Sequence, residues 1–327
     1  MDSRSEAVAP MSYQARFAER WGHLHNPHVR ALAWLIDSPD LLDPLAEEWA
    51  GKLAAPSVVD AGVRNWLAQL EHDPAPLLAA LGERPFTRLG LYAEKLMAFY
   101  YQAQGRLVAH GLQVRASRND TVGEFDFLLE AGEDKVEHIE LATKFYLLEG
   151  EAASRFDTLI GPNLADSLGA KMRKIIHKQL ALGAHPAAQA ILPRPVLRAH
   201  ALVKGWLFYP RARLAAAPMA GIAPAHCTGF WCAVDELRAL APAAWVILPR
   251  LQWLAPYRLE PGAAVLDGPA LALAVGALFE QTRSPVMVAA VAEVATSVDG
   301  GLVEQSRGFI VPDDWQARAL LRQQAQP

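Results

Sequence analysis

The sequence predicts an α/β protein in which helices flank a mixed β-sheet. This prediction rests on residues 86–210, where hydrophobic patterns indicate a helix, three strands, a second helix and a fourth strand. Short turns containing Gly, Asp and Asn separate the three strands, as in antiparallel hairpins. A strand that follows a helical crossover usually joins the same sheet in a right-handed sense. We therefore expect a sheet that mixes both strand directions.

Each of these elements has its own signal. Pro85 and Thr87 open a long helix from about Phe86 to Gln104, and Gly105 ends it. The three strands that follow have the sequences LVAHGLQVRAS, EFDFLLE and VEHIELATKFYLL. A Gly-Pro-Asn turn then introduces a helix from Asn163 to about Leu182, and the apolar, aromatic segment HALVKGWLFYP is typical of a buried strand.

The regions on either side of this core differ from it in pattern. Residues 1–84 are rich in Leu and Ala, and Pro and Asp residues separate the apolar segments. This pattern predicts a helical N-terminal region. Residues 85–211 contain the core, and residues 212–327 alternate short helical and strand-like segments. This last part is expected to be a C-terminal α/β extension of the sheet or a second lobe. A chain of 327 residues has room for one large domain or two ordinary ones.

Composition excludes several classes of protein. Hydrophobic residues make up 52% and charged residues 20% of the chain, enough for a full core and too little charge for a disordered protein. Two cysteines do not make a disulfide scaffold and fit a reducing cytosol. The N-terminus lacks the apolar stretch of a signal peptide, and the longest uncharged run, residues 214–234, is broken by Pro and Gly. We expect a soluble, cytoplasmic protein without membrane contact.

The net charge of −4 hides an asymmetry along the chain. Residues 154–213 contain ten basic residues against two acidic ones, a net charge of +8, whereas the remainder has 21 basic against 33 acidic residues, a net charge of −12. Within the basic stretch, Lys171, Lys174 and Lys178 recur at helical spacing. They predict either a surface that contacts a nucleic-acid backbone or a solvated helix face.

Acidic residues and a lysine alternate along the second and third predicted strands. Asp126 lies in EFDFLLE, and Glu140 and Lys144 lie on one face of HIELATK. If these strands pair as a hairpin, the two carboxylates converge, with an ammonium close by. Glu94 is a third acid, on the long helix among apolar neighbours, where a carboxylate needs a partner or a metal.

This set of residues has a chemical use. Carboxylate oxygens are ligands for Mg²⁺ (or Mn²⁺), and such an ion can activate water and neutralise charge on a phosphodiester. A nearby lysine can orient the attacking water or stabilise the transition state. Each residue also has a purely structural interpretation. Asp126 could be an edge-strand carboxylate that a turn or an arginine hydrogen-bonds, Glu140 and Lys144 could form a cross-strand ion pair, and Glu94 could pair on the surface with a base such as Lys95.

Five segments carry a resemblance to a known family: FTRLGLYAEKL, GEFDFLL, HIELATKFYL, the Gly-Pro-Asn helix entry and KGWLFYP. On these segments the chain resembles the uncharacterised bacterial family catalogued as domain of unknown function 1853, itself similar to the PD-(D/E)XK nuclease superfamily. The resemblance implies a restriction-endonuclease-like (αβββαβ) core and Mg²⁺-dependent hydrolysis of DNA or RNA. It also implies that Glu94 is the helix acid, Asp126 the first metal ligand, Glu140 the second acid and Lys144 the catalytic lysine.

One position departs from the superfamily pattern, which has an acidic residue two positions before the lysine. Here that position is Ala142, and Glu140 lies four positions before Lys144, roughly 13 Å away along a strand. An active, divergent nuclease and a catalytically inactive nuclease-fold module that binds nucleic acid or a protein partner both agree with this sequence. A site for a small phosphorylated metabolite is a third alternative.

Overall fold

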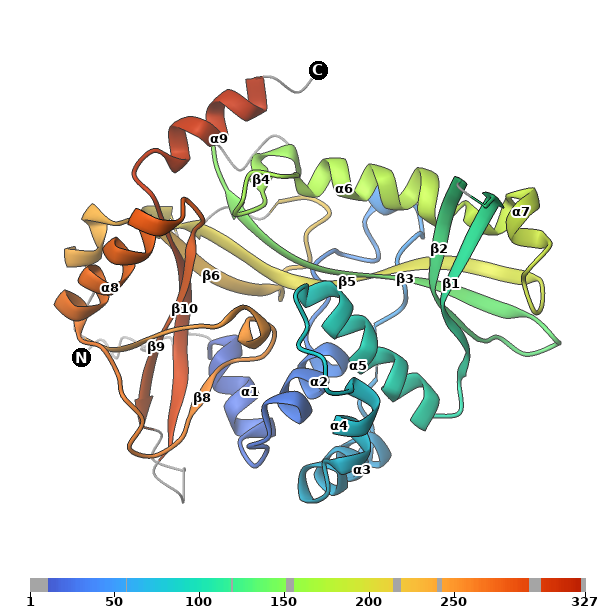
Figure 1. Cartoon of the computed structure of the whole chain (residues 1–327), viewed down its shortest axis with the longest axis horizontal. Coiled ribbons are helices and arrows are strands. Elements are labelled where there is room, and N and C mark those ends of the chain that lie inside the picture. Colours follow the sequence, from blue (N-terminus) through green and yellow to red (C-terminus); the bar gives the residue numbers. More distant parts are fainter. Residues whose placement is uncertain are drawn as a thin grey trace, which may run out of the picture.

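A single mixed β-sheet runs through the structure, a computed structural model that describes residues 11–56, 58–118, 120–150, 156–213, 219–239, 243–293 and 301–324. Within these ranges ten strands are ordered β1-β2-β3-β5-β6-β10-β9-β7, with β4 beside β3 and β8 beside β10 (Figure 1). Parallel and antiparallel pairs both occur. The predicted class, a mixed sheet flanked by helices, is confirmed.

The central part of the sheet has the predicted order of elements. One helix precedes three antiparallel strands, and β5 returns parallel to β3 after a second helix. Gly111, within the first of these strands, has a left-handed φ of +61°. The elements are α5 (Leu89–Ala103), β1 (Leu107–Ser117), β2 (Asp120–Glu130), β3 (Val136–Leu148), β4 (Leu159–Ile160), α6 (Leu168–Lys174) and β5 (Val196–Pro210).

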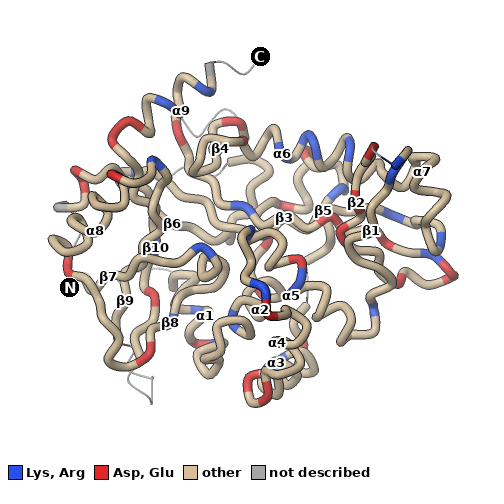
Figure 2. The backbone as a smooth tube through the Cα atoms, in the orientation of Figure 1, with Lys and Arg blue, Asp and Glu red and all other residues tan. Residues whose placement is uncertain are grey.

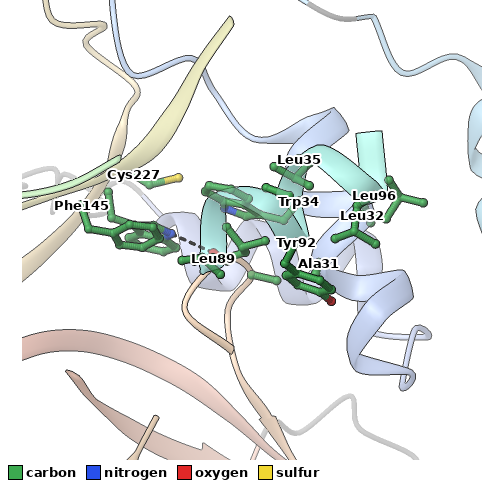
Figure 3. Close-up of a cluster of buried hydrophobic side chains, with 14 of the residues drawn as sticks. Ala31, Leu32, Trp34, Leu35, Leu89, Tyr92, Leu96, Phe145 and Cys227 are labelled. Carbon is green, nitrogen blue, oxygen red and sulfur yellow. Dashed lines mark hydrogen bonds between the residues drawn. The ribbon is translucent and has the colours of Figure 1, made fainter. Parts of the chain in front are cut away.

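The N-terminal region contains four helices among its described residues and lies with α5 on one side of β3 and β5 (Figure 1). Its helices are α1 (Tyr13–Trp21), α2 (Pro27–Asp37), α3 (Ala61–His72) and α4 (Ala75–Leu81). α2 packs on α5, and their apolar side chains meet the sheet residue Phe145 in one buried cluster. Figure 3 shows this cluster, with Trp34 of α2 and Tyr92 of α5 near its centre. The packing fixes α5, and with it Glu94, against the sheet.

The opposite side of the sheet is covered by α6, which continues into a π-helical segment, Ile175–Gln179, and the short α7 (Pro186–Gln189). Met172 and Ile175 are buried there against Ala142 and Tyr146 of β3. The predicted start of this helix at Asn163 is wrong, because α6 begins at Leu168. Leu164 adopts a left-handed φ of +57°, which stops helix growth, and Ser167 caps α6 by accepting a hydrogen bond from the Ala170 amide.

The C-terminal strands extend the same sheet. β6 (Cys227–Ala233) pairs in parallel with β5, and β10 (Leu302–Val311) pairs in parallel with β6. The remaining elements are β7 (Ala244–Ile247), β8 (Arg258–Leu259), α8 (Gly268–Gln281), β9 (Val286–Glu293) and α9 (Trp315–Gln324). Among the described residues, no helix is long and apolar enough to cross a membrane.

Candidate active site

The acidic residues meet where β2 separates from β3. The two strands pair only over Val136–Ile139, and β3 next gains a neighbour on that side at Leu147, where β4 pairs with it. Between these points, residues 140–146 of β3 have β5 on one side and no strand on the other within the described ranges. Asp126 and Glu140 lie next to the last β2–β3 pair, which is Phe127 with Ile139. The carboxylate of Asp126 accepts a hydrogen bond from the Leu141 amide at 2.9 Å.

Asp126 and Glu140 form a buried carboxyl pair. Burial is the main reason that the pKa of each lies above its ordinary value, and the charge of Glu140 raises the pKa of Asp126 further. The two carboxyl groups lie close enough to repel each other when both are charged, which disfavours ionisation of the pair. The side-chain amide of Gln179 donates a hydrogen bond to Oε1 of Glu140. The predicted convergence of these two acids is therefore present.

The second oxygen of Glu140 is unsatisfied. Oε2 is buried, and no amide, hydroxyl or basic donor among the described residues bonds it. The Nε2 atom of His138 lies 3.8 Å away, too far for a hydrogen bond, and both ring nitrogens of this fully buried histidine are likewise without partners in the described part of the chain. Burial lowers the pKa of His138 to about 4, so the imidazole is neutral.

Glu94 reaches the same region from α5. Burial and the charges of Asp126, Glu124 and Glu140 raise its pKa to about 7. Its carboxylate lies back along the helix toward Gly90, where a Cβ atom would be 3.8 Å from Oε1. Glu94 is thus electrostatically part of the acidic cluster. Within the described ranges, however, no three Asp, Glu, His or Cys side chains form a group able to hold a metal ion.

Lys144 lies farther along β3 than the carboxyl pair. Burial and the positive charge of Lys171 lower its pKa to about 8, while Asp166 and Glu140 act in the opposite direction. Lys144 lines a cavity that begins at the N-terminus of α5 and includes Asp166. Lys144 thus lines this cavity and is also within electrostatic reach of Glu140.

The predicted basic face lies partly against the acids, and Figure 2 shows Lys and Arg along α6 beside acidic residues of β2 and β3. Lys171 and Lys174 both lower the pKa of Glu140, and Lys171 donates a hydrogen bond of 3.4 Å to Gln179. Lys178 is exposed. The bond from the Leu180 amide to the Ile175 carbonyl inserts a π turn, which moves Gln179 onto the face of Lys171.

Sequence reasoning missed Gln179, His138 and Asp166. Uniform helical spacing placed Lys178 at the position that Gln179 takes, and nothing in the sequence pattern indicates the π turn. His138 alternates with Glu140 on the same strand face, a signal that could have drawn attention to it.

Comparison with known proteins gives one match. No curated protein and no solved structure is similar to this chain. The sequence profile of a domain of unknown function (DUF1853) matches residues 30–311, which include the helix of Glu94, the carboxyl pair, Lys144 and all ten described strands. The profile covers most of the chain, and the protein therefore belongs to the DUF1853 family.

Proposed function

We propose that this protein is a metal-dependent phosphodiesterase that hydrolyses DNA or RNA. The observation that carries the proposal is the buried pair of Asp126 and Glu140 at the separation of β2 from β3, with Glu94 and Lys144 beside it. Carboxyl groups gathered with raised pKa values are costly to a fold and are typical of functional sites. The order of α5, β1, β2, β3, α6 and β5 supports a restriction-endonuclease-like core.

The residues present fit a divalent cation with two carboxylate ligands. The raised pKa values of Asp126 and Glu140 and the unsatisfied Oε2 of Glu140 both agree with a site for a positive charge between these groups. Asp126 and Glu140 would hold Mg²⁺ or Mn²⁺, and Glu94 would contribute its charge. When bound, the ion supplies a Lewis acid and lowers the pKa of water.

The other residues have roles that follow from their charges. Lys144 can donate hydrogen bonds to a phosphoryl oxygen while protonated, and its lowered pKa also lets it take a proton from water near pH 8. Lys171 and Lys174 lie close enough to Glu140 to lower its pKa, so they can contact the backbone phosphates of a bound strand without reading its sequence. Nucleic acid is therefore the proposed substrate.

The proposal is tested with purified full-length protein and its Asp126→Asn and Glu140→Gln variants. Each is incubated with single- and double-stranded DNA and RNA in Mg²⁺ or Mn²⁺. Wild type is expected to cleave at least one substrate, and each variant to lose about a hundredfold or more of that rate, because a metal-binding carboxylate is removed. Mn²⁺ is also expected to raise the thermal midpoint of wild type and not that of Asp126→Asn.

Glu130→Gln is the matched control, since Glu130 lies on the same strand but is exposed and paired with Arg194. It should retain wild-type cleavage. If wild type and Asp126→Asn are equally inert and the metal stabilises neither, the phosphodiesterase proposal is wrong. Binding of nucleic acid by such inert proteins would then favour the non-catalytic binding module.

A further inference from the structure

The cavity that Lys144 lines adjoins the acidic cluster on the open edge of β3. It has a volume of about 300 Å³ and lies between the start of α5, the loop before α6 and a short turn at Arg250–Gln252. Its polar and aromatic lining includes Arg88, Lys144, Asn163, Asp166, Arg250 and Trp253. This volume is at the lower end of ligand sites, which suits one small ligand or the end of a longer one.

The cavity carries an excess of positive charge. Arg88, Lys144 and Arg250 line it, and no ion-pair partner for any of them is found among the described residues. Asp166 is the acidic member of the described lining, and its carboxylate accepts a hydrogen bond of 3.0 Å from the hydroxyl of Tyr146. Three cations are thus opposed by one carboxylate that already has a partner.

Two further features prepare the cavity for an anion. The guanidinium of Arg250 lies 5.4 Å from the centre of the Trp253 ring, which restricts the arginine before any ligand arrives. α5 begins at this cavity, with Leu89 and Gly90 in the lining, and the side chain of its N-cap residue, Arg88, makes no capping hydrogen bond. The helix start therefore adds amide donors and a partial positive charge to those of the side chains.

We infer that this cavity binds a phosphate monoester, the dianionic group of a nucleotide or of a phosphorylated nucleic-acid end. Two negative charges on one tetrahedral group match the three cationic side chains of the lining better than the single charge of a phosphodiester does. Binding does not depend on hydrolysis. One consequence rests on the proposed function: because Lys144 lines the cavity and also lies toward Glu140, a phosphate held here would place the adjoining nucleotide near the carboxyl pair.

The test measures binding of fluorescein-labelled oligonucleotides of one sequence that end in 5′-phosphate, 3′-phosphate or hydroxyl, in EDTA so that no cleavage occurs. Wild type is expected to bind one phosphorylated form about tenfold or more tightly than the hydroxyl form, as charge-assisted hydrogen bonds allow. Arg88→Ala and Arg250→Ala should each lose most of this preference. Arg84→Ala removes the same charge four residues before Arg88 and outside the cavity, and should keep it.

Competition with an unlabelled mononucleotide separates the two sources of the phosphate. Displacement at a similar concentration assigns the cavity to free nucleotides, and failure to displace assigns it to strand ends. Equal binding of all three oligonucleotides, with no effect of the mononucleotide, would overturn the inference. Asp126→Asn should keep the preference for phosphorylated ends. A wild-type protein that prefers a phosphorylated end but cleaves nothing would refute only the proposed hydrolysis. A wild-type protein that cleaves but binds all ends equally would refute only the phosphate cavity.

Discussion

At the scale of single residues, the candidate site is a group of carboxyls that the fold keeps partly protonated. Asp126, Glu140 and Glu94 all have raised pKa values, with burial as the largest cause in each case. A folded protein holds such protons more tightly than the unfolded chain does. Its free energy of unfolding therefore decreases as the pH rises from the unfolded pKa toward the folded one. The acids of the site act against stability at neutral pH.

Glu94→Gln tests this cost, because glutamine cannot ionise. The pKa of Glu94 is 4.5 unperturbed and about 7 in the folded protein. Its contribution to stability is complete below about pH 4.5 and is lost as the pH rises to about 7. Relative to wild type in EDTA, the variant is expected to gain on the order of 1 kcal/mol between pH 4.5 and pH 8, after allowing for solvent screening. Urea unfolding at the two pH values measures the gain.

The control for this measurement is Glu19→Gln, which removes a carboxylate from the exposed face of α1. It should track wild type at both pH values. A Glu94→Gln protein that does the same would show that this carboxyl does not belong to the buried cluster.

The positions of single site residues could be predicted where their helix or strand has a regular hydrophobic periodicity. Strand alternation placed Asp126 and Glu140 on one patch, and in the structure the charge of Glu140 raises the pKa of Asp126. Glu94 was found because a carboxylate was unexpected among apolar neighbours. The position of Lys144 in one cavity with Asp166 could not be predicted from the sequence. It depends on the loop before α6, and the left-handed conformation of Leu164 in that loop has no sequence signal.

At the scale of elements, one π turn decides which side chain completes the site. A π turn contains an extra residue, so the helix face shifts by one position beyond it. In a regular α-helix Lys178 would follow Lys171 and Lys174 along one face. In the structure Lys178 is exposed, and Gln179 bonds both Lys171 and Glu140. The turn thus replaces a third lysine with a neutral amide at the carboxyl pair.

Gln179→Ala is expected to destabilise the protein by about 1–3 kcal/mol, because Oε1 of Glu140 loses its donor while it remains buried. Lys178→Ala, one residue earlier and exposed, should change the free energy of unfolding by less than about 0.5 kcal/mol. Urea unfolding at pH 7 compares the two. Equal effects of the two substitutions would mean that the Gln179 amide does not support Glu140.

Elements with long hydrophobic patterns were predictable, and those that depend on local backbone geometry were not. The strands around Phe127 and Phe145 and the helix around Leu96 appear where the apolar periodicity indicates them. The helix expected from Asn163 begins only at Leu168, since turn conformation and capping override propensity there. The separation of β2 from β3, on which the site depends, has no signal in either strand.

At the scale of the whole molecule, Arg307 of β10 joins the C-terminal third to the core and forms a buried ion pair with Glu304 of the same strand. Arg307 and Glu304 of β10 are both almost completely buried, with 2.7 Å between the guanidinium and the carboxylate. Arg307 also donates to the carbonyls of Trp253 and Ala255 and lies 4.0 Å from the ring centre of Trp206 on β5. The same arginine thus connects β10 to β5 and to the segment that contains Trp253 of the phosphate cavity.

Arg307→Met is therefore expected to destabilise the whole protein by about 3–5 kcal/mol, because it leaves the carboxylate of Glu304 as an uncompensated buried charge. Arg283→Met is the matched control: it breaks an ion pair with Asp314 whose arginine is 77% exposed, and such pairs contribute about 0–1 kcal/mol. Urea unfolding followed by circular dichroism and by tryptophan fluorescence measures both variants. If the sheet is one cooperative unit, the two signals shift together in Arg307→Met. A shift in only one of them would mean that the C-terminal strands unfold separately from the site.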